Sequence, residues 1–236
     1  ACRPACWVGA RVQLHAKRAT PDLDFKKLAR QQMFLTPQSL NDALNWRSTI
    51  WPSVNVDAGP LEDDWRSLAE LVSDAVAIED WLDYEASLTT SLDRRGRAAY
   101  LMTDYCRVLA AAAVPLFVGK GFVADLRPEL IALRYNVEAV EHAGRSVDER
   151  HYQLRFLTGA QIARQGEQAT GAGSREAFRI ALEGNLASVV ERLHDVSGLS
   201  RSAFWRLAGD AVAVAFLEAG RRLGCEQRAK KDAMAL

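Results

Sequence analysis

Apolar side chains recur at helical spacing in two long segments of the first half of the chain. One segment covers about 61–88, and three acidic residues near its start suit the positive end of a helix dipole. Its apolar stripe consists of Trp65, Leu68, Val72, Val76 and Leu82. The other segment covers about 98–113, and we expect Pro115 to end it because proline disrupts a helix interior. A shorter helix is predicted across 35–46, and a loop across 50–60.

The pattern then changes to an alternation of apolar and polar residues, which is typical of a half-buried β-strand. This alternation covers 130–140 and again 151–159, with the turn-rich segment 141–150 between them. The sequence therefore predicts two antiparallel strands joined by a turn.

Two further helices are predicted in the last third of the chain. The first follows a glycine-rich loop at 166–174, with Ser174 as its N-cap. Its apolar stripe is Phe178, Leu182, Leu186, Val189 and Leu193. The second begins after Ser200 and is apolar on more than one face, so we expect it to lie centrally. Gly224 stands where a glycine commonly ends a helix.

These elements together predict a mainly α protein of the α+β class, a helical bundle with a small antiparallel β element. We expect an N-terminal segment at 1–55 that is partly irregular, and a helical domain with a β-hairpin at 56–225. A short basic tail is expected at 226–236. The length of 236 residues is enough for a substantial hydrophobic core.

The charge balance argues against a general nucleic-acid binder. Thirty basic residues match thirty acidic ones, whereas such a binder normally carries a basic excess. The segment 198–212 resembles the second half of a helix-turn-helix, but its helix continues into the apolar stretch 211–219, which must be buried. We therefore expect no nucleic-acid partner.

The sequence also favours a cytoplasmic protein without a transmembrane segment. The longest apolar run, 108–118, is shorter than the roughly 20 residues that a membrane span needs, and Pro115 interrupts it. The first 19 residues contain no continuous apolar stretch of the kind found in secretory signals. In the cytoplasm the four cysteines would stay reduced or bind metal.

Two acidic motifs have the spacing of metal ligands. Glu191 and His194 form an E-x-x-H pair of the kind used in di-iron bundles, but those sites need a second copy. The cluster Glu79, Asp80, Asp83 and Glu85 has oxygen ligands suited to a hard cation. For both motifs a solvated helix face is the simpler interpretation.

The cysteines give a weaker metal signal. Cys106 lies among apolar neighbours and is expected to be a buried small side chain. Cys2 and Cys6 have C-x3-C spacing, and two thiolates alone complete no site.

Three stretches resemble the ferric-siderophore reductase family (FhuF-like). They are RAAYLMTDYCRVLAAAAVPLFV at 97–118, LRPELIALRYN at 126–136, and the segment 181–225, which contains SGLSRSAFWRLAGDAVAVAFLEAG. These stretches lie within 60–225, and the resemblance extends over most of that range.

The resemblance implies a function in iron release. Members of this family accept imported ferric hydroxamate-type siderophores in the cytoplasm, at the inner face of the inner membrane, with which they can associate peripherally. They reduce Fe(III) to Fe(II), which binds hard oxygen chelators far more weakly. The electron passes from a donor protein through a [2Fe-2S] cluster held by C-terminal cysteines. The fold also occurs in siderophore synthetases.

The chain departs from the family at the cluster segment. The family has two adjacent cysteines where this chain has Gly224-Cys225, and a second pair of cysteines further on, where this chain has 233–236, AMAL. A [2Fe-2S] cluster usually needs four thiolates, so Cys225 is one metal ligand at most. Either Cys2, Cys6 and Cys225 converge with a further ligand, or the cluster is absent. In the second case the protein is a non-redox siderophore-binding or accessory module.

Candidate substrate-binding residues are cationic or aromatic, because many ferric siderophores are polar or carboxylate-bearing. Arg134 and Arg155 alternate with apolar residues on the predicted strands, and Trp205 and Arg206 open the last helix. The alternative is that the arginines face solvent and Trp205 belongs to the core.

Overall fold

The computed structural model describes residues 37–88, 91–142, 145–160, 162–164 and 171–236. Its helices are α2 (Pro37–Ile50), α3 (Leu68–Ser73), α4 (Ala75–Ala86), α5 (Arg94–Lys120), α6 (Gly171–Ser197), α7 (Arg201–Arg222) and α8 (Glu226–Met234), with a short 3₁₀ turn, η1 (Pro128–Leu130). The strands are β1 (Asn55–Gly59), β2 (Arg66–Ser67), β3 (Phe122–Ala124), β4 (Ile131–His142), β5 (Arg145–Leu157) and β6 (Ile162–Arg164). The predicted mainly α architecture of the α+β class is confirmed. Most of the predicted N-terminal segment, with Cys2 and Cys6, lies outside the described residues.

The β4–β5 hairpin is the predicted antiparallel pair, and it is longer than the sequence pattern indicated. Pairing extends from Ile131 opposite Phe156 to His142 opposite Arg145, so most of the expected turn at 141–150 is strand. The sheet has the order β1-β5-β4-β2, and β1 runs parallel to β5. The sheet is therefore mixed, and the prediction of a loop across 50–60 was wrong for β1. A separate pair joins β3 to β6.

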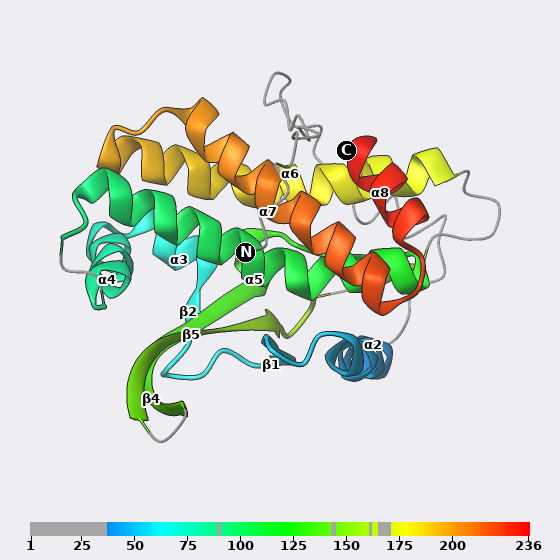
Figure 1. Cartoon of the computed structure of the whole chain (residues 1–236), viewed down its shortest axis with the longest axis horizontal. Helices are drawn as coiled ribbons and strands as arrows, with labels where there is room; N and C mark the ends of the chain where they lie inside the picture. Colours follow the sequence, from blue (N-terminus) through cyan, green and yellow to red (C-terminus); the bar gives the residue numbers. More distant parts are fainter. Residues whose placement is uncertain (1–36, 89–90, 143–144, 161, 165–170) are drawn as a thin grey trace, which may run out of the picture.

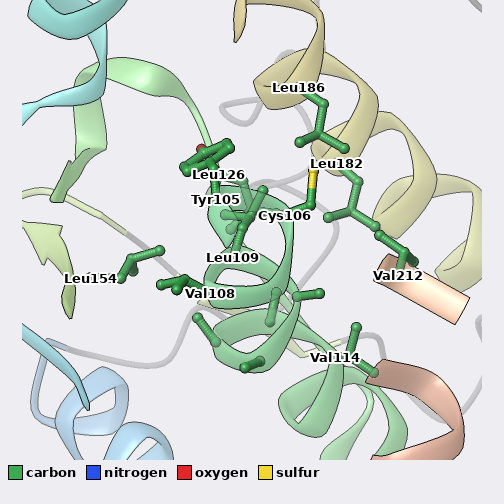
Figure 2. Packing of buried hydrophobic residues seen from close by; sticks show 14 of the residues in the cluster. Tyr105, Cys106, Val108, Leu109, Val114, Leu126, Leu154, Leu182, Leu186 and Val212 are labelled. Carbon is green, nitrogen blue, oxygen red and sulfur yellow. The ribbon is translucent and has the colours of Figure 1, made fainter. Parts of the chain in front are cut away.

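Helix α5 is the centre of the molecule. Figure 1 shows α6 and α7 along one side of it and the sheet along the other, and α5 contacts all three. In the core, Leu182 and Leu186 of α6 pack near Cys106, and Leu154 of β5 lies towards Val108 on another side of α5 (Figure 2). Because α5 is enclosed in this way, its second half is buried almost all round.

Pro115 lies inside α5, so the prediction that it ends the helix was wrong. A proline at this position removes the N–H that would bond the carbonyl of Ala111. The buried side chain of Arg47 replaces that donor, with its Nε 2.8 Å from the Ala111 oxygen, and its Nη1 lies 2.6 Å from the Val54 oxygen. The helix continues to Gly121, whose φ of 67° is the left-handed conformation that favours glycine.

The single long helix predicted across 61–88 is two helices. Asp74 has an extended backbone and ends α3. Its carboxylate accepts hydrogen bonds from the backbone N–H groups of Val76 and Ala77, at 2.6 and 2.8 Å, so it also caps α4. After this break Val76 is 69% exposed and does not belong to the apolar stripe predicted for it.

The C-terminal helices largely follow the sequence pattern. All five residues of the predicted α6 stripe are buried, but α6 begins at Gly171, ahead of the predicted cap at Ser174. Ser200 caps α7 as expected, and Gly224, with φ 65°, follows its end. The segment expected to be a basic tail forms α8, whose Ala229 and Ala233 pack into the core with Leu236 beyond them.

Helix α5 is also long and apolar enough to cross a membrane, by length and composition alone. Its most apolar window is 83% buried inside the protein, and a core helix of a soluble protein shows the same combination.

Candidate functional site

Arg134 and Arg155 meet on the outer face of the sheet. Arg134 is opposite Gln153 in the β4–β5 ladder, and Arg155 is two residues further along β5, so the strand alternation places both side chains on the same face. Both guanidinium groups lie over the ring of the buried Trp65, at 5.1 Å for Arg134 and 4.2 Å for Arg155. The sequence predicted the two arginines, but it did not identify Trp65 as their common partner.

The charges of these arginines are already matched by carboxylates. Arg155 forms a two-pronged contact with Asp57, at 2.8 and 2.9 Å, and lies 3.0 Å from Glu62. Arg134 contacts Asp64 at 2.5 Å. The hydrogen bond from Arg134 lowers the pKa of Asp64, and the bond to Asp57 raises the pKa of Arg155. An anionic ligand would therefore have to displace a carboxylate here.

Trp205 and Arg206 do not join the strand arginines. Trp205 is 9% exposed and belongs to the hydrophobic core, as the alternative interpretation held. Arg206 is exposed, and within the part of the chain that the structure describes we find no ion pair for it. Helix α5 lies between α7 and the sheet (Figure 1). The four candidate residues therefore lie in two separate places and do not form one site.

Cys225 is the residue just before α8, and it is partly buried. Its sulfur lies 3.5 Å from Nη2 of Arg228, which also donates a hydrogen bond to the carbonyl of Val118. Cys106 points towards Leu182 and Leu186 of α6 (Figure 2), and burial raises the pKa of its thiol. Among the described residues, these two cysteines form no shared site.

The described residues do not fit a [2Fe-2S] cluster. Such a cluster needs about four thiolate ligands, and the described part of the chain offers Cys225 and the core residue Cys106. No group of three or more His, Cys, Asp or Glu side chains within the described ranges could hold a metal ion. Cys2 and Cys6 lie outside those ranges.

The acidic cluster on α4 divides into two kinds of residue. Glu79 is paired with Arg94, and Asp83 lies 2.6 Å from Arg97, at the protein surface. This is the solvated face that the sequence suggested. Glu85 is different because its side chain is fully buried.

Glu85 is the centre of a buried polar network that joins α4 to β5. One carboxylate oxygen accepts a hydrogen bond from the hydroxyl of Tyr152, and the other lies 2.6 Å from Arg150. The Tyr152 oxygen in turn accepts from the indole of Trp81 at 2.9 Å, and Arg150 also lies 3.6 Å from Asp104. Burial raises the pKa of Glu85 to about 7, although Tyr152 and Arg150 oppose this shift.

The sequence contained a signal for this network. Glu85 is seven residues after Ile78 and four after Trp81, so it falls on the buried stripe of α4. A carboxylate in an apolar stripe needs a buried partner. Because Glu85 and Tyr152 at its centre are buried, and only Arg150 and Asp104 reach the surface in part, the network fixes α4 against the hairpin.

The E-x-x-H pair on α6 has ordinary partners. Glu191 is paired with Arg201 at 2.5 Å, and Nδ1 of His194 lies 2.8 Å from the carbonyl oxygen of Leu199. Both contacts fix the turn between α6 and α7. The exposed Glu191 agrees with the solvated helix face that was expected for this motif.

Comparison of the chain with protein-family models, with curated proteins and with solved structures gives no match.

Proposed function

We propose that this protein binds a ferric siderophore in the cytoplasm and takes part in releasing its iron, with the reducing electron supplied by a separate donor. The observation that supports this proposal is the packing of the three stretches that resemble the ferric-siderophore reductase family. They form α5, most of α6, all of α7 and the first half of β4, and α5 contacts both α6 and α7. The two helical stretches, 97–118 and 181–225, therefore pack against each other.

The electron is assigned to an external donor because the described cysteines are too few to hold a cluster. Within the described residues, Cys225 has an arginine beside it and no neighbouring thiol. One electron converts the bound Fe(III) to Fe(II), and the chelator then holds the metal weakly. What the chain contributes in this proposal is the binding and orientation of the chelate. A non-redox accessory role is the second candidate, and the same cysteine geometry favours it.

Arg134 is the better placed of the two strand arginines for contact with a ligand. Its side chain is 36% exposed, against 11% for Arg155, and Gln153 lies beside it. A carboxylate or hydroxamate oxygen could replace Asp64 on its outer side. Trp65 would hold the guanidinium in place during that exchange.

The first test is equilibrium binding of ferrichrome, with iron-free ferrichrome as the reference. We expect the wild-type protein to prefer the ferric form and Arg134→Gln to weaken binding by about tenfold, the size of one lost charge-assisted contact. Arg66→Gln is the matched control, since Arg66 is an exposed arginine on the neighbouring strand β2. Equal affinity for the ferric and iron-free forms would argue against the function.

A second test addresses the electron. After anaerobic incubation with iron and sulfide, we expect no stoichiometric [2Fe-2S] absorption, and Fe(II) formation only when a reducing protein is added. A full cluster, with matching iron and acid-labile sulfide, would show instead that the protein carries its own electron centre. Binding without any reduction would leave the accessory role.

A further inference from the structure

The exposed face of α8 differs from every other cationic surface described above. It consists of Gln227, Lys230, Lys231, Met234 and Ala235, and we call it the α8 face. These residues follow the i, i+3, i+4, i+7, i+8 spacing of one helix side. They line a shallow, largely open depression on one side of the helix. The buried residues Ala229 and Ala233 hold the opposite side of α8 against the core.

The lysines of this face are not neutralised by the carboxylates of their own helix. Asp232 is directed to Arg175 on α6, at 3.1 Å, and Glu226 lies nearest Arg221 at the end of α7. Among the described residues, no carboxylate pairs with Lys230 or Lys231. The strand arginines, in contrast, are each paired already.

Met234 adds an apolar surface to the two charges. Its side chain is 64% exposed, which is unusual for a methionine, and it lies one helical turn beyond the lysines. A flexible thioether can adapt to an irregular ligand surface. The α8 face therefore offers one amide, one apolar contact and two ammonium groups that pair with no carboxylate of the described residues.

We propose that the α8 face binds an anionic, carboxylate-bearing ferric chelate. This inference rests on the proposed function and adds a second binding surface, separate from Arg134, for one class of ferric chelate. A ligand with several carboxylates gains charge-assisted hydrogen bonds from Lys230 and Lys231 without displacing any ion pair. A neutral hydroxamate complex gains no such attraction and has no preference for this face.

The test is titration with ferric rhizoferrin, a citrate-based chelate, at low salt, with ferrichrome as the neutral comparison. We expect Lys230→Gln/Lys231→Gln to weaken binding of ferric rhizoferrin by about tenfold or more and to leave ferrichrome unchanged. Binding by the wild-type protein should also weaken as salt is added, because the site is exposed. Glutamine has nearly the helix propensity of lysine, so α8 is retained, and circular dichroism checks this.

The matched control is Arg95→Gln/Arg145→Gln, which removes the same two charges from exposed positions on α5 and β5. An equal loss in both double variants would mean that only net charge matters, and would overturn the inference. Ferrichrome binding without ferric rhizoferrin binding would overturn it while leaving the proposed function intact. Failure of both chelates to bind would remove the proposed function itself. Equal, lysine-dependent binding of iron-free rhizoferrin would show a general anion site and would also overturn the inference.

Discussion

The two faces of the β4–β5 hairpin carry the same kinds of group in different surroundings. On the outer face Arg155 pairs with Asp57, whose side chain is 46% exposed, and lies over Trp65. On the inner face Arg150 pairs with Glu85, which is fully buried beside Tyr152. The difference lies in the carboxylates: water can solvate the half-exposed Asp57 if its pair is broken, but it cannot reach the carboxylate of Glu85. The same chemistry therefore leaves the outer face open to a ligand and makes the inner face part of the fold.

The largest expected effect is the loss of the buried carboxylate. Glu85→Ala should lower the free energy of unfolding by about 3 kcal/mol or more, because Arg150 and the Tyr152 hydroxyl lose a buried partner. Urea denaturation measures this loss. Glu79→Ala is the matched control on the same helix, and its surface pair should contribute no more than about 1 kcal/mol. Equal losses in the two variants would mean that burial of the carboxylate does not decide how much its pair stabilises the protein.

The buried face should also give the protein a pH-dependent stability. In the folded state the pKa of Glu85 is about 7, above the ordinary value of 4.5, so the folded chain keeps a proton that the unfolded chain releases. The contribution of Glu85 to the free energy of unfolding is therefore fully present below about pH 4.5. It decreases as the pH rises to about 7, by up to about 3 kcal/mol.

Glu85→Gln tests this dependence because glutamine cannot titrate and keeps one of the two accepting oxygens. Urea denaturation between these pH values should show a flatter profile for this variant than for the wild type. The quantity to compare is the change in the free energy of unfolding with pH in each protein. Parallel profiles would mean that the Glu85 carboxyl has an ordinary pKa.

A smaller effect is expected on the outer face. Arg155→Met removes the pairs with Asp57 and Glu62 but keeps an apolar side chain over Trp65, so it should cost about 1 kcal/mol. Added salt should reduce that difference, because the carboxylates are half-exposed. Arg155→Lys should have an intermediate effect, since lysine keeps the charge without the two-pronged geometry. A loss as large as that of Glu85→Ala would show that this face is also structural.

The sequence predicted the elements whose pattern is local. The alternation in β4 and β5, the α6 stripe and the Ser200 cap depend on residues only a few positions apart, and the structure confirms them. The two strand arginines were also identifiable, because alternation places them on one face. Trp65 was not identified as their partner, since residues 61–65 were predicted to be helical.

The errors came from partners that are distant in sequence. Pro115 has the local property of a helix terminator, but Arg47, 64 residues from Ala111, supplies the missing donor. Strand β1 has a loop-like composition and is a strand because β5 offers it an edge. The interpretation of Glu85 as part of a solvated face failed because Tyr152 and Arg150 lie 65 or more residues away.

By itself, the sequence determined the mainly α character, the hairpin and the buried stripe of α6, because apolar spacing decides which side of an element is buried; the enclosed central helix is α5 and not α7, where Val214 is 64% exposed. Only the tertiary structure decided which charges are paired. It directed Asp232 to Arg175 and, among the described residues, left Lys230 and Lys231 without carboxylate partners; it also enclosed Glu85 while leaving Asp57 half-exposed. The physical reason is that the energy of a charge depends on its distance to a partner and its access to water, and both are set by the packing of distant segments.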